Sequence, residues 1–300
     1  MSQALLGVQI ALLVGGLGYA ALSDLRTREV TDRLWQVLGV VGWGLGAVWL
    51  APGGILPVAL WLLVGGLTIQ HMFPWDDALG KRLDRFADLI EGVAYMLVIL
   101  VVLVAAVHWG IGTSGVPLAV IALLATMLFA RGLFELGVLY GGADAKALMV
   151  AGLLLPLLPT PLLPQTAPVA LLLTVLPFPV NLLVDAAVLS LAVPVAIAVR
   201  NVARREFEFP RGFTGYMIPV KELPDRFVWL KDPLLAEEED AAETSEEDRE
   251  IRVRAAHDLE AKGVERVWVT PQIPFVVLLA LGAVAALLAG NLLLDLFAAL

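Results

Sequence analysis

Two aspartates, Asp24 and Asp144, are the residues of this chain whose type and setting could do chemistry. Asp144 lies in the stretch 140–146 (YGGADAK), between the apolar runs 116–129 and 147–159. An ionisable group at such a membrane boundary is costly, which makes it a functional candidate. Two carboxyl groups that meet in a low-dielectric site share one proton, so one can activate a water while the other donates to a carbonyl oxygen. This is the chemistry of aspartyl peptide hydrolysis, which needs no metal and no cysteine.

Small residues, Gly141, Gly142 and Ala143, come directly before the second aspartate. They remove side-chain bulk where another backbone must come close. Hydrolysis requires an extended substrate because a helix shields its own carbonyl groups, and these three residues would give a strand-like substrate room to approach. The alternative is that Asp144 only caps the start of a helix, since aspartate is a favoured N-cap residue.

Charged neighbours accompany both aspartates. Arg26 and Arg28 follow Asp24, so a simple interfacial anchor is the alternative there. Asp32 is interpreted as a helix-start residue. Lys146, two residues beyond the second aspartate, points away from it on a helix, and we expect it to contact the membrane surface or acids that are paired with arginines; the alternative is that it tunes Asp144. Three basic residues are candidates for supporting the two aspartates: Arg26, Arg28 and Lys146.

Other polar residues lie within apolar segments. Asn181 and Asp185 are one helical turn apart and predict either a second polar site or a helix–helix hydrogen bond. Asp295 is expected to face water near the outer end of the last apolar segment. Arg131 and Glu135 lie four residues apart and can pair on one helix face.

The composition restricts the class of protein. Of the 300 residues 59% are hydrophobic and only 16% are charged, which indicates a polytopic helical membrane protein. There is no cysteine, and the three histidines show no ligand spacing, so neither a metal site nor a cofactor is predicted. The net charge of −9 comes largely from residues 237–250, and it argues against nucleic acid as a partner.

Hydropathy predicts an all-α polytopic membrane protein of about eight transmembrane helices, with a cytoplasmic mixed insertion before the last helix. Residues 1–199 form a transmembrane bundle carrying both aspartates, residues 200–271 a soluble insertion with an acidic linker at 235–250, and residues 272–300 the C-terminal helix. The predicted spans are 5–22, 34–50, 55–73, 89–109, 116–139, 147–159, 169–199 and 274–300.

The distribution of basic residues predicts the orientation. With eight spans, all 20 lysines and arginines fall in one set of loops, whereas loops 51–54, 110–115 and 160–168 have none. Basic residues beside spans stay on the cytoplasmic side, so the N-terminus is expected outside and the large loop inside the cell membrane. Four spans separate Asp24 from Asp144, which returns both carboxylates to the cytoplasmic face.

The two aspartate motifs resemble those of a known family. Residues 24–30 (DLRTREV), after the first span, and residues 141–146 (GGADAK), at the start of a later one, are similar to the paired motifs of the type IV prepilin peptidases. These are membrane aspartyl proteases of the Gly-x-Gly-Asp type. Segments 213–216 (FTGY) and 268–275 (WVTPQIPF) are also similar to the archaeal branch, the preflagellin (prearchaellin) and prepilin peptidases.

The resemblance implies an endopeptidase that removes the leader peptide of pilin or archaellin precursors at the cytoplasmic membrane face. Its partners would be such leaders and the lipid bilayer, without a cofactor; an oligomeric state is not implied. Leaders of this kind end in basic residues, which acidic residues of this chain could attract: Asp76, Asp77, Asp84, Asp88 and the run 237–250. A solvated disordered linker explains that run equally well.

The chain departs from the family pattern in three ways. Ala143 replaces the second glycine of the motif, and four spans rather than two separate the aspartates, which preserves sidedness. The zinc-binding cysteines of bacterial relatives are missing, and there is no sign of a methyl-donor site.

Two alternatives come from other classes. A small-solute or ion transporter would show charges near the bilayer midplane and an internal repeat, whereas Asp185 is the only deeply placed acid and no repeat is evident. A protease of the presenilin or signal-peptide-peptidase kind would carry a Tyr-Asp motif and a Pro-Ala-Leu segment, and this sequence has neither.

Overall fold

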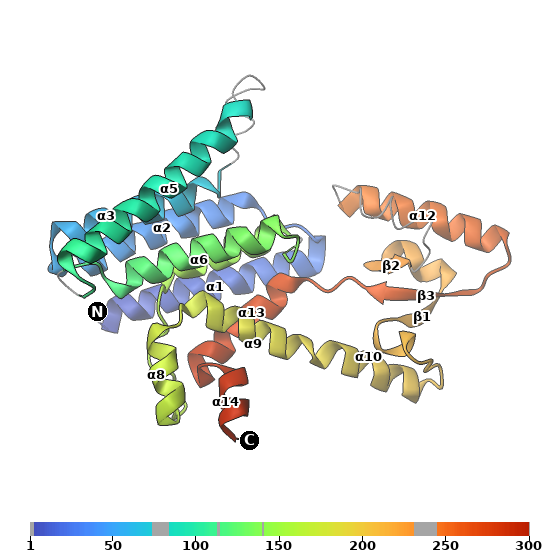
Figure 1. Ribbon diagram of the computed structural model, residues 1–300. Helices are drawn as coiled ribbons and strands as arrows, with labels where there is room; N and C mark the ends of the chain where they lie inside the picture. Colours follow the sequence, from blue (N-terminus) through green and yellow to red (C-terminus); the bar gives the residue numbers. More distant parts are fainter. Residues whose placement is uncertain (1–2, 74–83, 113–114, 140, 231–244, 300) are drawn as a thin grey trace. The chain divides into compact units, whose positions relative to one another are not determined.

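The computed structural model describes residues 3–73, 84–112, 115–139, 141–230 and 245–299 (Figure 1). Asp76, Asp77 and most of the predicted acidic linker 235–250 lie outside these residues. The chain forms two compact units. The first comprises Met1–Asp24, Val30–Val188 and Phe275–Leu300, and the second comprises Leu25–Glu29 and Leu189–Pro274.

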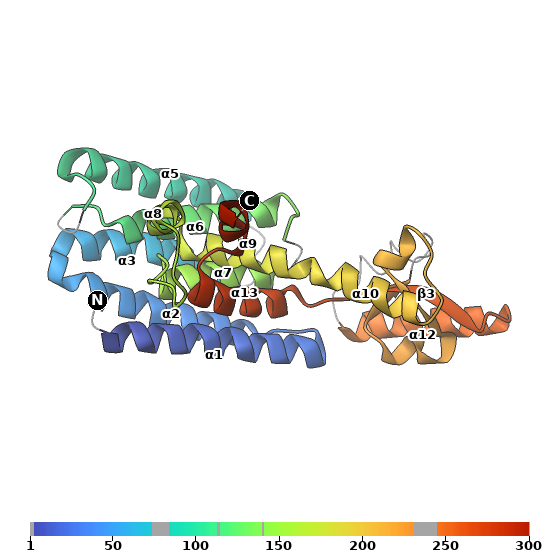
Figure 2. The same cartoon turned by 90° about the horizontal axis from the view of Figure 1, so that it is seen from below.

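The first unit is a helical bundle. In two views at right angles, α1, α2, α3 and α6 run side by side (Figures 1 and 2). The helices that it contains are α1 Gln3–Thr27, α2 Asp32–Leu50, α3 Ile55–Gln70, α5 Asp84–Trp109, α6 Leu118–Glu135, α7 Gly142–Leu154, α8 Ala167–Val175, α9 Phe178–Ser190, α13 Phe275–Ala289 and α14 Leu292–Ala299, with a short 3₁₀ turn η1 at Ala51–Gly53.

Helix α7 is the centre of this bundle and packs against both α2 and α6. Nearly all of its residues from Asp144 to Leu154 are buried. A helix that is apolar on every side is stable only when other helices surround it. The helix that carries the second aspartate is therefore held from several directions.

Glycines allow the close approach of α2 to its neighbours. A Cβ atom at Gly42 would lie 3.2 Å from the backbone carbon of Leu153 in α7. A Cβ at Gly46 would overlap the indole of Trp61 in α3, which donates a 2.8 Å hydrogen bond to the carbonyl of Trp43. Small residues at helix contacts are typical of membrane bundles, in which van der Waals packing replaces the hydrophobic effect between helices.

The structure supports a mostly helical, membrane-type protein, but it does not reproduce the eight predicted spans. Within the described residues, five helices are long and apolar enough to cross a bilayer, and α13 with α14, bent by 48°, would make a sixth as one span. Helix α3 is apolar but shorter. The five are Gln3–Thr27, Asp32–Gly53, Leu89–Trp109, Leu118–Glu135 and Phe178–Ala203.

Prolines explain two of the differences. The predicted span 169–199 begins instead at Phe178, because α8 ends before Pro177 with Leu176 in an extended conformation. The predicted span 147–159 is helical only to Leu154, because Leu155, directly before Pro156, is no longer in the helical conformation (φ −135°, ψ 84°). Proline lacks a backbone N–H and disfavours the helical conformation of the residue that precedes it.

The second unit contains a small sheet and one long helix. Strands β1 Tyr216–Pro219, β3 Arg266–Pro271 and β2 Val228–Leu230 form an antiparallel sheet in the order β1-β3-β2. The remaining elements are α10 Ala192–Ala203, η2 Arg211–Phe213, η3 Val220–Asp225 and α12 Ser245–Ala261. Apolar side chains from the sheet, η3 and α12 make a separate core, which includes Ile218, Leu223, Val228, Ala255 and Val269.

Residues 25–29 also belong to the second unit. The guanidinium group of Arg28 lies 4.6 Å from the centre of the Phe227 ring, which is a cation–π contact. Arg28 has a φ of 60°, a left-handed conformation that ends α1. The residues directly after Asp24 thus make contacts within the second unit.

Candidate active site

Asp24 and Asp144 both belong to the first unit. Asp24 is half-buried near the C-terminal end of α1, beyond the apolar part of that helix, and Arg26 after it is exposed. Asp144 is buried, with 9% of its surface exposed, in the first turn of α7. A carboxylate in the first turn of a helix is favoured by the helix dipole.

Gly141, not Asp144, is the N-cap residue of α7. The alternative that Asp144 is merely the N-cap is therefore wrong, because Asp144 is the third residue of the helix and no side chain caps this end. Its carboxylate folds back toward Gly141, where an added Cβ would lie 3.0 Å from Asp144 Oδ2. A Cβ at Gly142, in contrast, would meet nothing within 4 Å. Gly141 leaves room for the carboxylate, and Gly142 leaves open space beside it.

The charge of one aspartate acts on the other. Burial, followed by the negative charge of Asp24, raises the pKa of the Asp144 carboxyl from 3.8 to about 7. Asp144 lies ahead of the apolar run of α7 and outside the candidate membrane-spanning helices. Two acids that far apart in sequence thus come within electrostatic reach, and the arrangement can hold one proton at neutral pH.

Lys146 contacts an acid that the sequence did not pair with it. Its Nζ lies 2.5 Å from Oδ1 of Asp32, the first residue of α2. The position of Asp32 at a helix start is confirmed. The ion pair joins the first turn of α7, which carries Asp144, to the first turn of α2. No sequence signal marks the pairing, because the two residues lie 114 positions apart.

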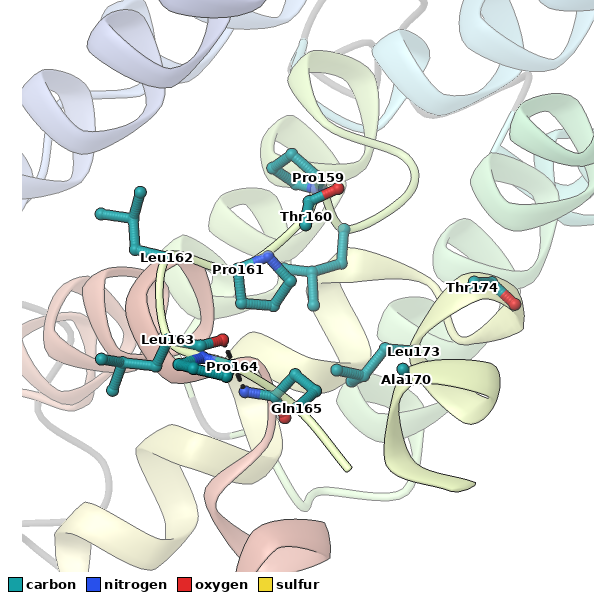
Figure 3. Close-up of a pocket in the computed structure, with 11 residues that line it drawn as sticks. Pro159, Thr160, Pro161, Leu162, Leu163, Pro164, Gln165, Ala170, Leu173 and Thr174 are labelled. Atoms are coloured by element: carbon teal, nitrogen blue, oxygen red, sulfur yellow. Dashed lines mark hydrogen bonds between the residues drawn. The ribbon is translucent and has the colours of Figure 1, made fainter. Parts of the chain in front are cut away.

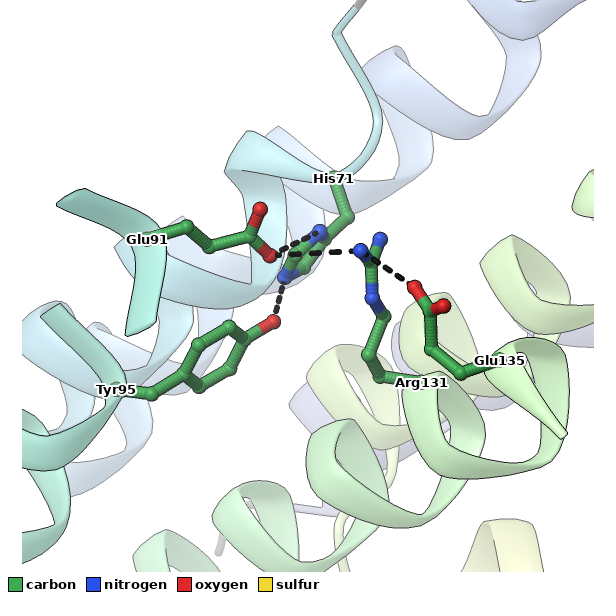
Figure 4. Close-up of polar contacts among 5 residues, drawn as sticks. All are labelled: His71, Glu91, Tyr95, Arg131 and Glu135. Atoms are coloured by element: carbon green, nitrogen blue, oxygen red, sulfur yellow. Dashed lines mark hydrogen bonds and ion pairs between the residues drawn. The ribbon is translucent and has the colours of Figure 1, made fainter. Parts of the chain in front are cut away.

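A second polar cluster joins α3, α5 and α6 (Figure 4). Arg131 pairs with Glu135 at 2.6 Å, which confirms that prediction, and lies 3.8 Å from Glu91. Nδ1 of His71 lies 3.8 Å from Glu91, and its Nε2 shares a hydrogen bond with the hydroxyl of Tyr95. The sequence showed His71 only as an isolated histidine. This cluster ties α5, whose other face is largely exposed, to its neighbours.

A pocket of about 410 Å³ lies elsewhere in the first unit, between the proline-rich segment 158–165 and α8 (Figure 3). Its lining residues are uncharged, with Thr160, Gln165 and Thr174 as its polar members. It lacks the acids that peptide hydrolysis needs. Within the described part of the chain, no group of three or more His, Cys, Asp or Glu side chains is arranged to hold a metal ion.

Fold and site together define a multi-pass helical protein of membrane type with two acids that influence each other. Residues 209–292 match the family model described as archaeal peptidase A24 C-terminus type II. The match supports a prepilin-type peptidase and confirms the resemblance to the archaeal prepilin and preflagellin peptidase family. No curated protein matches the chain. The matched residues include the sheet, α12 and α13, but neither aspartate.

Proposed function

We propose that the protein is a membrane-embedded aspartyl endopeptidase that removes the N-terminal leader of prepilin- or prearchaellin-like precursors, with Asp24 and Asp144 as its catalytic residues. The observation that carries the proposal is the burial of Asp144 within electrostatic reach of Asp24; burial first, and then the charge of Asp24, raises the pKa of the Asp144 carboxyl to about 7, which keeps a proton on the pair near neutral pH. The peptidase family match in the C-terminal part of the chain supports it.

The pair supplies both proton transfers that peptide hydrolysis needs. The ionised carboxylate accepts a proton from a water molecule, whose oxygen attacks the carbonyl carbon of the scissile peptide. The protonated carboxyl donates its proton to the carbonyl oxygen, which gives a neutral tetrahedral intermediate. That intermediate breaks its C–N bond as a proton moves to the leaving amine. Because the two acids titrate together, these roles belong to the pair and not to one residue.

The segment before Asp144 is proposed as the place where the substrate backbone enters. Gly141 and Ala143 are half-buried and Gly142 is exposed, so an extended strand can come close to the carboxylate without meeting a side chain. Ala143 packs against the core of the bundle. A methyl group at this position therefore faces protein rather than the open side of the site.

The proposal includes a membrane orientation. The N-terminus lies outside and the soluble loop lies in the cytoplasm, where exposed acids at the start of α12, such as Glu246 and Glu250, would attract the basic end of a leader. Incubation of membranes that carry the protein with a candidate precursor tests the function. The mass of the shortened product gives the cut bond, and an uncut precursor would contradict the proposal.

The rate of cleavage is expected to fall as the pH rises through about 7. Above the pKa of the Asp144 carboxyl the shared proton is lost, and no acid remains to protonate the substrate carbonyl. The loss should approach about tenfold per pH unit on the alkaline side. The measurement is kcat/KM for a leader peptide as a function of pH. A rate that keeps rising well into the alkaline range would exclude this role of the pair.

Lys146 is expected to act as a positioning residue through Asp32. Lys146→Gln should lower the cleavage rate by at most about fivefold, because the side chains of the pair are 21% and 48% exposed and such ion pairs are weak. The double variant Lys146→Asp with Asp32→Lys should recover most of the rate, as should Lys146→Arg alone. If neither recovers it, the lysine acts by another route.

A further inference from the structure

A further polar cluster of the first unit, distinct from the one around His71, lies where α13 and α14 meet. The two helices are bent by 48°, and Gly290 between them has a φ of 94°. The backbone N–H of Leu292, the first residue of α14, donates to Oδ1 of Asp185 in α9 at 2.8 Å. Asp185 is fully buried, so an acid inside an apolar bundle holds the start of a broken helix.

Other segments satisfy the backbone on both sides of the break. On the α13 side, the N–H of Leu163 donates to the carbonyl of Leu288 at 2.8 Å, and Nε2 of Gln165 donates to the carbonyl of Ala289 at 2.5 Å. The proline-rich segment that supplies these donors also lines the pocket of Figure 3. Carbonyl groups at the C-terminal end of α13 thus have hydrogen-bond partners outside the helix.

On the α14 side, two asparagines complete the arrangement. Oδ1 of Asn291 accepts the N–H of Leu294 at 3.0 Å, as an N-cap residue does. Its Nδ2 donates to Oδ1 of Asn181 at 2.8 Å, one turn before Asp185 on α9. Asn181 and Asn291 are both buried. The helix–helix hydrogen bond predicted from the spacing of Asn181 and Asp185 is therefore present.

Helices α9 and α13 are in close contact beside this cluster. A Cβ at Gly282 of α13 would overlap the backbone carbonyl of Leu182 in α9. The two backbones therefore touch within one turn of Asp185. Helices α9 and α13 carry no ionisable residue other than Asp185.

One oxygen of the acid is left without a hydrogen-bond donor. Oδ2 of Asp185 is buried and has no partner among the described residues. The charged group that acts on it is Asp295 of α14, which has the same sign. An ionised carboxylate in such surroundings is strongly unfavourable unless a positive charge accompanies it.

We propose that the buried Asp185 carboxylate at the break between α13 and α14 binds a small monovalent cation, a sodium ion or a proton, and that its occupancy stabilises the broken helix. In membrane transporters, sodium ions and protons are often bound where a transmembrane helix is interrupted. A single buried carboxylate with one unpaired oxygen suits one positive charge. A divalent ion would ask for a richer set of acidic ligands than the described residues gather here.

Thermal unfolding of the full-length protein in detergent tests the proposal. The wild type is compared with Asp185→Asn in sodium chloride and in choline chloride at equal ionic strength, and in a pH series without sodium. Asparagine keeps an Oδ1 acceptor for Leu292 but carries no charge. A bound ion raises stability in proportion to the logarithm of its concentration. The wild-type Tm should therefore rise with sodium or with falling pH, and the variant should lose that response.

The comparison with the variant separates this site from the aspartate pair. Asp144 also titrates near neutral pH, but its contribution is present in both proteins and cancels in the difference. A response to sodium lost in the variant identifies a sodium site, and a response to pH lost in the variant identifies a proton site. If the wild type shows neither effect, or if both proteins respond alike, the proposal is overturned. If Asp185→Asn fails to fold, the comparison of sodium with choline in the wild type still decides, because titration of Asp144 does not respond to that exchange of cations, and a wild type that does not respond to it overturns the proposal. Neither measurement depends on peptidase activity.

Discussion

Asp144→Asn is expected to lower leader cleavage by at least about 100-fold, and Asp24→Asn by a similar factor, because general acid–base catalysis contributes 10²–10⁴-fold. An amide can neither take up a proton from water nor hold the shared proton of the pair. The measurement is the rate of product formation from a precursor in membranes that carry equal amounts of each variant.

The loss should occur without unfolding. Because the pKa of the buried Asp144 carboxyl is raised from 3.8 to about 7 by folding, the stability falls as the pH rises from about 4, and the full cost is present above about 7. Asp144→Asn removes that cost, so its Tm above neutral pH should equal or exceed that of the wild type. Asp258→Asn, at an exposed position of α12, is the control and should cut at the normal rate. Near-normal cleavage by either site variant would remove that aspartate from the mechanism.

Gly42→Leu is expected to lower stability by about 1–3 kcal/mol or more, together with a loss of cleavage. The new side chain would meet Leu153 and Leu154 of α7 at a position where even a Cβ comes within 3.2 Å. Helix α7 must move away from α2, and it carries Asp144. A shift of about 1 Å at a reacting group costs on the order of 100-fold in rate.

Gly44→Leu on the same helix is the matched control. A Cβ at Gly44 meets nothing within 4 Å, so the same substitution there adds bulk without a collision. The comparison uses thermal unfolding in detergent and the rate of leader cleavage. Equal effects of the two substitutions would mean that the contact of α2 with α7 does not position the site.

The long helices could be predicted from the sequence, whereas several helix ends and contacts could not. Continuous apolar runs predicted α1, α2, α5 and α6, because segments of that length in a bilayer have no structure other than a helix that pairs their backbone groups. The predicted extents of the spans that contain α7 and α8 were wrong. Hydropathy averages over Pro156 and Pro177 and takes no account of the backbone N–H group that each proline lacks.

The contacts between distant residues depend on packing. The parity of the spans placed Asp24 and Asp144 on one face but gave no distance between them, and it assumed a span count that the structure does not reproduce. The pairing of Lys146 with Asp32 depends on how α7 lies beside α2, which the glycines of α2 allow. The spacing of Asn181 and Asp185 indicated a polar contact, but its partner, the start of α14, required the fold.

The 13 residues of α7 set how water reaches the aspartates. A helix of that length rises roughly 20 Å, about two-thirds of a hydrocarbon layer of about 30 Å. Other helices of the bundle surround α7, so in a bilayer the aqueous phase must dip inward between them to meet its ends. Water, the nucleophile of the proposed reaction, can then reach the aspartates from the adjoining solvent without a separate channel through the bundle. Bilayers made from longer acyl chains should accordingly slow the reaction, and shorter chains should favour it.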